Sequence, residues 1–290
     1  MTSSPAAGRA LGGAEEGAEE PRTPAPLGRR CAAVIGVEDH GAYRLIWASD
    51  TRGPPDPCPG QFYMLATADR WGSEDGRPYL PRAFSHARVV SDPAPRVAFL
   101  LDAVGPGTER LGALEPGEEL WLSGPFGVGF RPVPASDHRP VLVGGGIGAA
   151  PILALADELD SGTTVLLGFR SAAHAHGAEL FAATVAVATD DGSRGRHALV
   201  TDLLREELDR DPEAVVYACG PPPMLEAVRA LCAARGTQAQ LALESGMACG
   251  FGACFGCVVP TRNGFVRLCL DGPVLDADRL ETGLFEGAGQ

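Results

Sequence analysis

Lysine is absent from the 290-residue sequence, so its 24 basic residues are all arginine. Without lysine the chain cannot contain the phosphate-binding lysine of a P-loop, and it cannot form a Schiff base with a carbonyl substrate or with pyridoxal phosphate. The 37 acidic residues exceed the basic ones and give a formal net charge of −13. This charge argues against a protein that binds nucleic acid or an anionic lipid surface.

The sequence also lacks a long uninterrupted apolar run. No uncharged stretch is longer than residues 140–156, which contain two prolines and four glycines and so favour a strand, a loop and a helix start over a membrane span. The N-terminus has no basic start followed by an apolar core, so we expect no secretory signal. The eight cysteines therefore do not indicate a disulfide scaffold, and we expect a cytoplasmic protein.

Changes in composition divide the chain into four parts. Residues 1–29 contain almost no large apolar side chain, which predicts a disordered tail. Residues 30–135 contain short apolar segments separated by glycine and proline, which predicts an antiparallel β-barrel. Residues 136–238 predict alternating strands and helices, typical of an α/β domain with a parallel sheet. Residues 239–290 are rich in cysteine and glycine and are predicted to be a small third domain.

The apolar patterns predict individual elements in the two larger domains. In the barrel, strands are expected over residues 31–37, 43–48, 61–66, 83–90, 96–103 and 119–122. In the α/β domain, strands are expected over 140–143, 163–169, 184–189 and 214–218. Helices are expected there over 150–159, 178–183, 200–208 and 223–235.

Four cysteines lie within 21 positions near the C-terminus, namely Cys249, Cys254, Cys257 and Cys269. The first three have C-x4-C-x2-C spacing, which is typical of plant-type ferredoxins that hold a [2Fe–2S] cluster on four thiolates. Glycines at positions 250, 252 and 256 allow a tight loop whose N–H groups point at the inorganic sulfide. A structural zinc site is the alternative, but such sites favour a C-x2-C pair at both ends.

A glycine-rich loop follows the first expected strand of the α/β domain. It contains four candidate contacts for the pyrophosphate of a dinucleotide, Gly144, Gly145, Gly146 and Gly148. The acidic residue usually found about 20 residues further on is missing, because the next strand ends at Arg170 and Ser171. The choice between NAD and NADP is therefore open. A glycine turn without any nucleotide is the alternative.

Cys219, Gly220 and Pro221 end another expected strand of this domain and precede a helix. Glycine lets a planar ring approach the backbone, and proline has no N–H to donate. Cys219 can therefore border a nicotinamide ring, although a buried thiol at a strand end is the alternative.

The expected barrel carries two further candidate segments. In the first, Arg82, Ala83, Phe84 and Ser85, the arginine can reach a phosphate, the aromatic ring can cover a flavin and the serine hydroxyl can bond to flavin N5. In the second, Gly107 and Thr108 begin a helical turn expected over residues 108–114 and are a second phosphate-binding candidate. Each segment is weak evidence alone, because similar turns end many strands.

In this order, the barrel segments, the glycine loop and the cysteine cluster resemble the ferredoxin–NADP reductase superfamily. Within it, the chain is most similar to the electron-transfer subunits of class B dihydroorotate dehydrogenases. The resemblance covers roughly residue 30 to the C-terminus. Its most specific parts are Thr189–Ser193, with the sequence TDDGS, and Leu270–Val274, with the sequence LDGPV after the last cluster cysteine.

The resemblance implies FAD on the barrel, NAD on the α/β domain and a [2Fe–2S] cluster on the four cysteines. FAD contacts are implied for residues 82–85, for the backbone of Leu100, Leu101 and Asp102, and for Gly107 and Thr108. Ser85 and Cys219 are the implied catalytic residues beside the reacting rings. The family usually has a larger residue at Ala83, a basic residue at Asp102 and an arginine at Gly246.

The implied partner is an FMN-containing catalytic subunit that oxidises dihydroorotate in pyrimidine biosynthesis, in a heterotetramer. Its electrons would pass through the cluster and FAD to NAD⁺. Two other functions fit the same sequence. One is the reductase subunit of another NAD(P)H:ferredoxin or hydrogenase-type complex. The other is a non-catalytic protein that senses redox state or binds a nucleotide.

Overall fold

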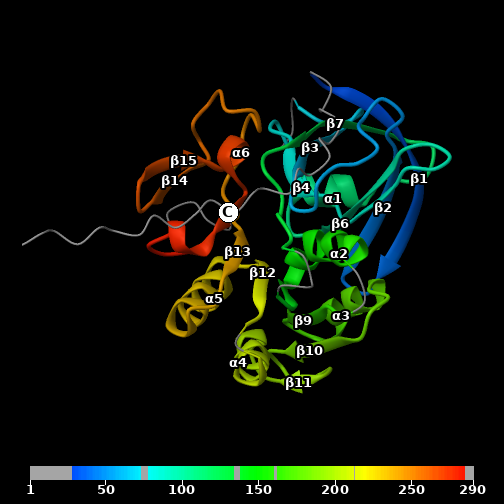
Figure 1. Ribbon diagram of the computed structural model, residues 1–290. Coiled ribbons are helices and arrows are strands. Elements are labelled where there is room, and N and C mark those ends of the chain that lie inside the picture. The colour runs from blue at the N-terminus through cyan, green and yellow to red at the C-terminus, as the bar shows by residue number, and fades with distance from the viewer. Residues whose placement is uncertain (1–27, 73–77, 134–137, 160–161, 212, 285–290) are drawn as a thin grey trace, which may run out of the picture.

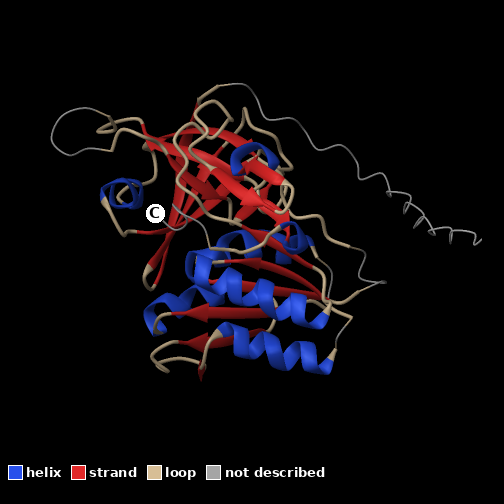
Figure 2. Cartoon of the chain, turned by 90° about the vertical axis from the view of Figure 1, so that its left-hand side faces the viewer, coloured by secondary structure: helices blue, strands red, loops and turns tan. Residues whose placement is uncertain are grey.

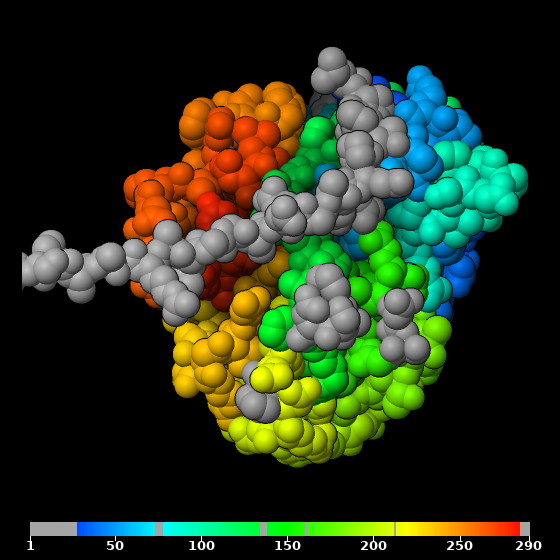
Figure 3. Space-filling model, in the orientation of Figure 1, coloured from blue at the N-terminus to red at the C-terminus, as the bar shows by residue number. Residues whose placement is uncertain are grey.

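The computed structural model describes residues 28–284, except residues 73–77, 134–137, 160–161 and 212. The tail expected over residues 1–29 lies outside the described residues, apart from its last two positions. The described chain forms a β-rich part, an α/β part and a cysteine-bearing part near the C-terminus (Figure 1). The space-filling view shows that the cysteine-bearing part, in orange and red, lies beside the other two (Figure 3). No helix of the described residues has the length and apolar character needed to cross a membrane.

The β-rich part is one seven-stranded antiparallel sheet with the order β4-β3-β7-β1-β2-β6-β5. Its strands are β1 (Arg30–His40), β2 (Tyr43–Ser49), β3 (Phe62–Thr67), β4 (Arg82–Ser85), β5 (Arg88–Val90), β6 (Arg96–Asp102) and β7 (Glu119–Phe126). The two edge strands, β4 and β5, are separated in sequence by only two residues. Because the three peptide steps between them span at most about 11 Å, the sheet must curl until its edges come close. This curl is the barrel that the sequence predicts.

The single strand expected over residues 83–90 is therefore wrong. Ser85 ends β4 on one edge of the sheet, and Arg88 begins β5 on the other edge. Residues 82–90 contain no glycine or proline, so the sequence carries no turn signal where the chain crosses between edges. The short helix α1 (Pro106–Gly112) begins two residues before the expected turn, because a proline fits its first position.

A buried ion pair holds the barrel strand β1 to the end of β2. The Arg30 guanidinium is 5% exposed and the Asp50 carboxylate 4% exposed, and the Arg30 Nε donates to Asp50 Oδ1 at 2.5 Å. The Arg30 Nη1 donates to the carbonyl oxygen of Gly124 at 2.7 Å. Arg30 thus joins β1, β2 and β7 at one point, and both charges of the pair are compensated inside the protein.

The α/β part contains a second seven-stranded sheet with the order β11-β10-β9-β8-β12-β13-β16. Its strands are β8 (Pro140–Gly145), β9 (Thr164–Phe169), β10 (Val185–Thr189), β11 (Arg196–His197), β12 (Val215–Cys219), β13 (Ala239–Ala242) and β16 (Val274–Asp276). All neighbours are parallel except β13 and β16, which are antiparallel. The parallel sheet predicted from the sequence is confirmed, with one antiparallel strand added at its edge.

Helices cover both faces of this sheet (Figure 2). They are α2 (Ala149–Glu158), α4 (Val200–Arg210) and α5 (Pro222–Arg235). Successive side chains of a strand point to opposite faces. Accordingly, Val141 and Val143 of β8 pack in the core that contains residues of α4 and α5, whereas Leu142 packs in the core that contains residues of α2.

The helix expected over residues 178–183 is wrong. The helical turns come earlier, as α3 (Ala172–Ala175) followed by a 3₁₀ segment (His176–Leu180). Ser171 precedes α3 with extended backbone, and its carbonyl oxygen accepts the N–H groups of His174 and Ala175 at 3.1 and 3.0 Å. The helical turns therefore begin directly after β9, and the alanine-rich stretch downstream leaves the helix.

The cysteine-bearing part is a loop, a hairpin of β14 (Val258–Thr261) and β15 (Gly264–Arg267), and the short helix α6 (Leu268–Asp271). The chain then enters the second sheet as β16. Just before β16, the N–H of Val128 in the barrel donates to the carbonyl oxygen of Gly272 at 2.5 Å. Strands β13 and β16 both fall in the range predicted for the third domain, and the boundary between residues 238 and 239 stays a prediction.

We predict that Asp50→Ala lowers the free energy of unfolding by about 3–5 kcal/mol, because the variant leaves the buried Arg30 guanidinium without its counter-charge. All three tryptophans lie between residues 47 and 121, so tryptophan fluorescence during urea unfolding reports on the barrel. Glu115→Ala is the control, since the Arg44–Glu115 pair is exposed and its loss costs about 1 kcal/mol or less. Equal effects of the two variants would contradict the stabilising role of the buried pair.

Candidate functional site

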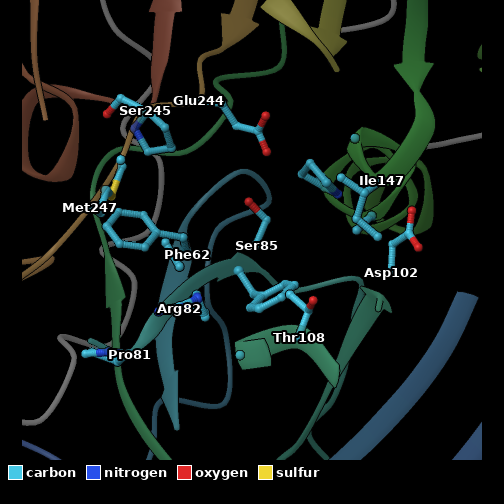
Figure 4. Close-up of a pocket in the computed structure, with 18 of the residues that line it drawn as sticks. Phe62, Pro81, Arg82, Ser85, Asp102, Thr108, Ile147, Glu244, Ser245 and Met247 are labelled. Carbon is cyan, nitrogen blue, oxygen red and sulfur yellow. The ribbon is translucent and has the colours of Figure 1, made fainter. Parts of the chain in front are cut away.

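One cavity of about 760 Å³ lies where the three parts of the molecule meet. Its walls include Ser85 of the barrel, Ile147 and Cys219 of the α/β part, and Met247 of the cysteine-bearing part. Figure 4 shows Ser85 and Glu244 pointing into this space from opposite walls. The volume is in the range of cofactor-binding clefts.

The barrel wall brings together the predicted FAD residues. Arg82, Ala83, Phe84 and Ser85 of β4 line the cavity, together with Leu100, Asp102, Gly107 and Thr108. The Arg82 Nη1 donates to the carbonyl oxygen of Leu80 at 2.6 Å, and its guanidinium carbon lies 5.8 Å from the centre of the Trp71 ring. A Cβ atom at Gly107 would lie 2.6 Å from the Arg82 Nε, so a larger residue there would displace the guanidinium from its present position.

Two of the predicted FAD residues have other partners. The Leu101 side chain packs in the barrel core and does not line the cavity. The Asp102 carboxylate lies 3.5 Å from the Arg170 guanidinium and 3.7 Å from the His174 Nε2, so it joins the end of β6 to β9 and α3. At this position an acidic side chain bridges two parts of the molecule, and its role toward FAD stays a prediction.

The predicted NAD residues gather at the carboxyl ends of two adjacent strands. Gly144 of β8 lies opposite Cys219 of β12, and the glycine loop runs past Pro221. A Cβ atom at Gly148 would lie 2.4 Å from the carbonyl oxygen of Cys219, and one at Gly145 would lie 2.4 Å from the Met224 sulfur. The glycines thus have a packing reason independent of any nucleotide.

Only part of the predicted NAD set lines the cavity. Gly148 and Cys219 are among its lining residues. The other predicted residues do not line it: Gly144, Gly145, Gly146, Gly220 and Pro221. Burial, with a smaller contribution from the nearby Glu244 carboxylate, raises the pKa of the Cys219 thiol far above its ordinary value. Cys219 is therefore a neutral thiol at neutral pH.

The sequence reasoning missed Glu244 and Ser245, which both line the cavity. Glu244 reaches solvent through the cavity, but the surrounding walls partly desolvate its carboxyl group and raise its pKa. Ser245 Oγ is buried and has no hydrogen-bond partner among the described residues, which fits a wall that contacts a polar ligand. Both residues directly follow β13, and ligands of parallel α/β sheets bind at the carboxyl ends of the strands, so this position could have indicated them.

The four cysteines are arranged as two pairs. The Cys257 and Cys269 sulfur atoms lie 3.2 Å apart, close enough to bind one metal atom together. Cys249 and Cys254 form the second pair, with a hydrogen bond between their side chains. Among the described residues, no three His, Cys, Asp or Glu side chains gather as a site for a single metal ion. Two pairs of thiols fit a group that contains two metal atoms.

The loop between the first cysteines folds around their sulfur atoms. Gly250 and Gly252 have φ angles of +80° and +86°, in the left-handed region that favours glycine. Burial raises the pKa of Cys249, but the N–H groups of Cys254, Phe251 and Ala253 donate to its sulfur and bring that pKa below its ordinary value. A thiol must lose its proton to bind a metal, and N–H donors directed at its sulfur stabilise the thiolate form.

Comparison with known proteins identifies this arrangement. The model of the iron–sulfur cluster binding domain of dihydroorotate dehydrogenase B matches residues 244–281, and an oxidoreductase NAD-binding domain matches residues 169–230. A dihydroorotate dehydrogenase B (NAD(+)) electron transfer subunit from Shouchella clausii is 40% identical over 227 residues, which cover 74% of this chain and 83% of that protein. The chain belongs to the family of dihydroorotate dehydrogenase B electron transfer subunits.

Members of this family match most of the chain. The electron transfer subunit of Clostridium acetobutylicum is 35% identical over 243 residues, covering 83% of this chain and 91% of that protein. The chain is accordingly an oxidoreductase with an NAD-binding domain and an iron–sulfur cluster binding domain.

Solved structures show the same fold. The structure of an NADH-dependent reduced ferredoxin-NADP oxidoreductase has a TM-score of 0.72 at 20% identity and covers 89% of this chain and 92% of its own. A ferredoxin NADP⁺ reductase from Neisseria gonorrhoeae, with bound FAD and NADP, has a TM-score of 0.55 at 16% identity and covers 72% of this chain and 92% of its own.

We predict that Cys257→Ser removes most of the iron while FAD stays bound, because the thiol pair and the barrel wall come from different parts of the chain. Iron and flavin are measured in the purified variant. Cys31→Ser, which changes a barrel cysteine outside the cluster loop, is the control and keeps its iron. Full iron retention in Cys257→Ser would rule out Cys257 as a ligand.

We predict that Arg82→Ala weakens FAD binding about 10- to 100-fold, the loss expected for one charge-assisted hydrogen bond to a phosphate. The measurement is flavin content after gel filtration, followed by titration with FAD. Arg88→Ala is the control, because Arg88 lies on β5 and pairs with Asp157 outside the cavity. If both variants bind FAD equally well, Arg82 does not contact the cofactor.

Proposed function

We propose that the chain carries electrons from an FMN-containing dihydroorotate dehydrogenase catalytic subunit, through a [2Fe–2S] cluster and FAD, to NAD⁺. The reaction would serve pyrimidine biosynthesis in the cytoplasm. The observation that supports it best is the cavity shared by the three parts. Ala248 and Gly256, each next to a cluster cysteine in sequence, line the same cavity as Ser85 and Cys219.

The three groups differ in the electrons they carry: the cluster moves one, NAD moves a hydride, and a flavin exchanges either one or two electrons. The chain's own residues fit a flavin between the other two sites. Arg82 would bind a phosphate, and Phe62 and Met247 give the cavity apolar walls that exclude water. Ser85 faces this interior from β4 and would donate a hydrogen bond to the ring system.

Cys219 and Glu244 would border the nicotinamide side of the cavity. Because the Cys219 thiol is neutral, it can pack against a ring without placing a charge there. Glu244 lies on the same wall with a raised pKa, so it holds a proton more readily than a glutamate with the ordinary pKa. NAD is the proposed dinucleotide, because the matching relatives are named for NAD(+) and the Arg170 guanidinium, the candidate partner of a 2′-phosphate, lies 3.5 Å from the Asp102 carboxylate.

The proposed partner follows from the family. The relatives are named as electron transfer subunits, which implies a catalytic subunit that supplies the electrons. We propose that this partner contains FMN and that the two chains form a heterotetramer. The exposed aromatic side chains of Phe251 and Phe255, 60% and 62% exposed, lie on the cysteine loop where such a partner would approach.

We predict that the purified chain shows flavin bands and a broad cluster shoulder, and that both bleach when NADH is added under anaerobic conditions. The measurement is the visible absorption spectrum before and after NADH, with iron, sulfide and flavin analysis of the same sample. A featureless spectrum with bound zinc would contradict the proposal.

Partner experiments separate the proposed function from the alternatives. Co-purification with an FMN protein that reduces NAD⁺ with dihydroorotate supports it. NAD(P)H-dependent reduction of ferredoxin or of a hydrogenase subunit, without dihydroorotate activity, would favour another reductase complex. Bound cluster and FAD without any NAD(P)H oxidation would favour a sensing or binding protein.

A further inference from the structure

Arg267 connects the loop of the first three cysteines to the segment that carries the fourth. It is the last residue of β15, two positions before Cys269. Its Nη1 donates to the carbonyl oxygen of Gly252 at 2.9 Å, and its guanidinium carbon lies 4.8 Å from the centre of the Phe255 ring. Its backbone N–H donates to the Asp271 carboxylate at 2.8 Å. Both the side chain and the backbone of Arg267 are therefore held in place.

A single peptide group, the one between Gly252 and Ala253, separates the Arg267 guanidinium from the Cys249 thiol. The N–H of that same peptide group belongs to Ala253, and it donates to the Cys249 sulfur. A cation bound to the carbonyl oxygen polarises the peptide and strengthens the N–H donor at its other end. The charge of Arg267 thus acts on the Cys249 sulfur through the 252–253 peptide.

Few other charges lie in this region of the chain. Between Glu244 and Asp271 the sequence contains only two charged residues, Arg262 and Arg267. Arg262 lies at the turn of the hairpin and donates from its Nε to the carbonyl oxygen of Asp278 at 2.9 Å. It contacts no part of the cysteine loop in any described interaction. Arg267 is the cation directed at that loop.

We propose that Arg267 is a positioning residue that raises the reduction potential of the [2Fe–2S] cluster, acting through the 252–253 peptide. The inference rests on the proposed function. Adding one electron makes the cluster and its thiolates more negative by one charge, so a fixed cation and a strengthened N–H donor stabilise the reduced form more than the oxidised form.

The test is a redox titration of the cluster in the full-length protein, followed by EPR of the reduced form. For Arg267→Gln we expect the ratio of reduced to oxidised cluster at a fixed potential to fall about tenfold, which is about 59 mV for one electron. Arg267→Lys keeps the charge and is expected to recover most of the potential. Arg262→Gln removes an equal charge from the same hairpin and is expected to leave the potential unchanged.

Two results would overturn the inference. One is an Arg267→Gln variant that keeps its iron and the parent's potential. The other result concerns Arg267→Lys, which is titrated instead if Arg267→Gln cannot hold iron. A tenfold or larger fall in its ratio of reduced to oxidised cluster, although the positive charge is retained, would show that the charge is not responsible. A parent protein without a [2Fe–2S] EPR signal would instead overturn the proposed function, so the two failures are distinguishable.

Discussion

The return of the chain into the second sheet determines how the three parts are arranged. After the cysteine-bearing segment, β16 pairs antiparallel with β13, and the N–H of Leu243 donates to the carbonyl oxygen of Pro273 at 2.9 Å. On its other side the same stretch bonds to Val128 of the barrel. A Cβ atom at Gly127 would lie 2.3 Å from the Gly272 carbonyl oxygen, so the two backbones touch. A few residues therefore fix the cysteine loop against both domains, and the shared cavity follows from that contact.

Much of this arrangement could be predicted from local patterns. Most barrel strands, strands β8, β9, β10 and β12 of the second sheet, and helices α2, α4 and α5 follow from apolar periodicity. The cysteine spacing indicates a metal-binding function, because few other functions need four thiolates on one short segment. The break between β4 and β5 could not be predicted, because no glycine or proline separates the two strands. Strands β11, β13 and β16 were also missed, since strands of two to four residues carry too little periodicity.

The same holds for the site: residues in short motifs could be predicted from the sequence, whereas contacts between residues far apart in the chain could not. Arg82 and Ser85, which line the cavity, could be singled out as candidates because both belong to one short segment with a recognisable sequence. Glu244 was missed because one acidic residue after a strand has no distinguishing neighbours in sequence. The contact of Asp102 with Arg170 joins positions far apart in the chain, and only the packing of barrel against sheet brings their opposite charges together.

The short edge strand β4 has a consequence for how the barrel meets other molecules. An exposed strand edge presents unpaired N–H and C=O groups that can recruit a strand from another chain and begin aggregation. Here the edge is only four residues long, its one strand neighbour is β3, and all four residues line the cavity. The four residues proposed to contact FAD thus also form an edge too short to pair readily with a strand from another chain.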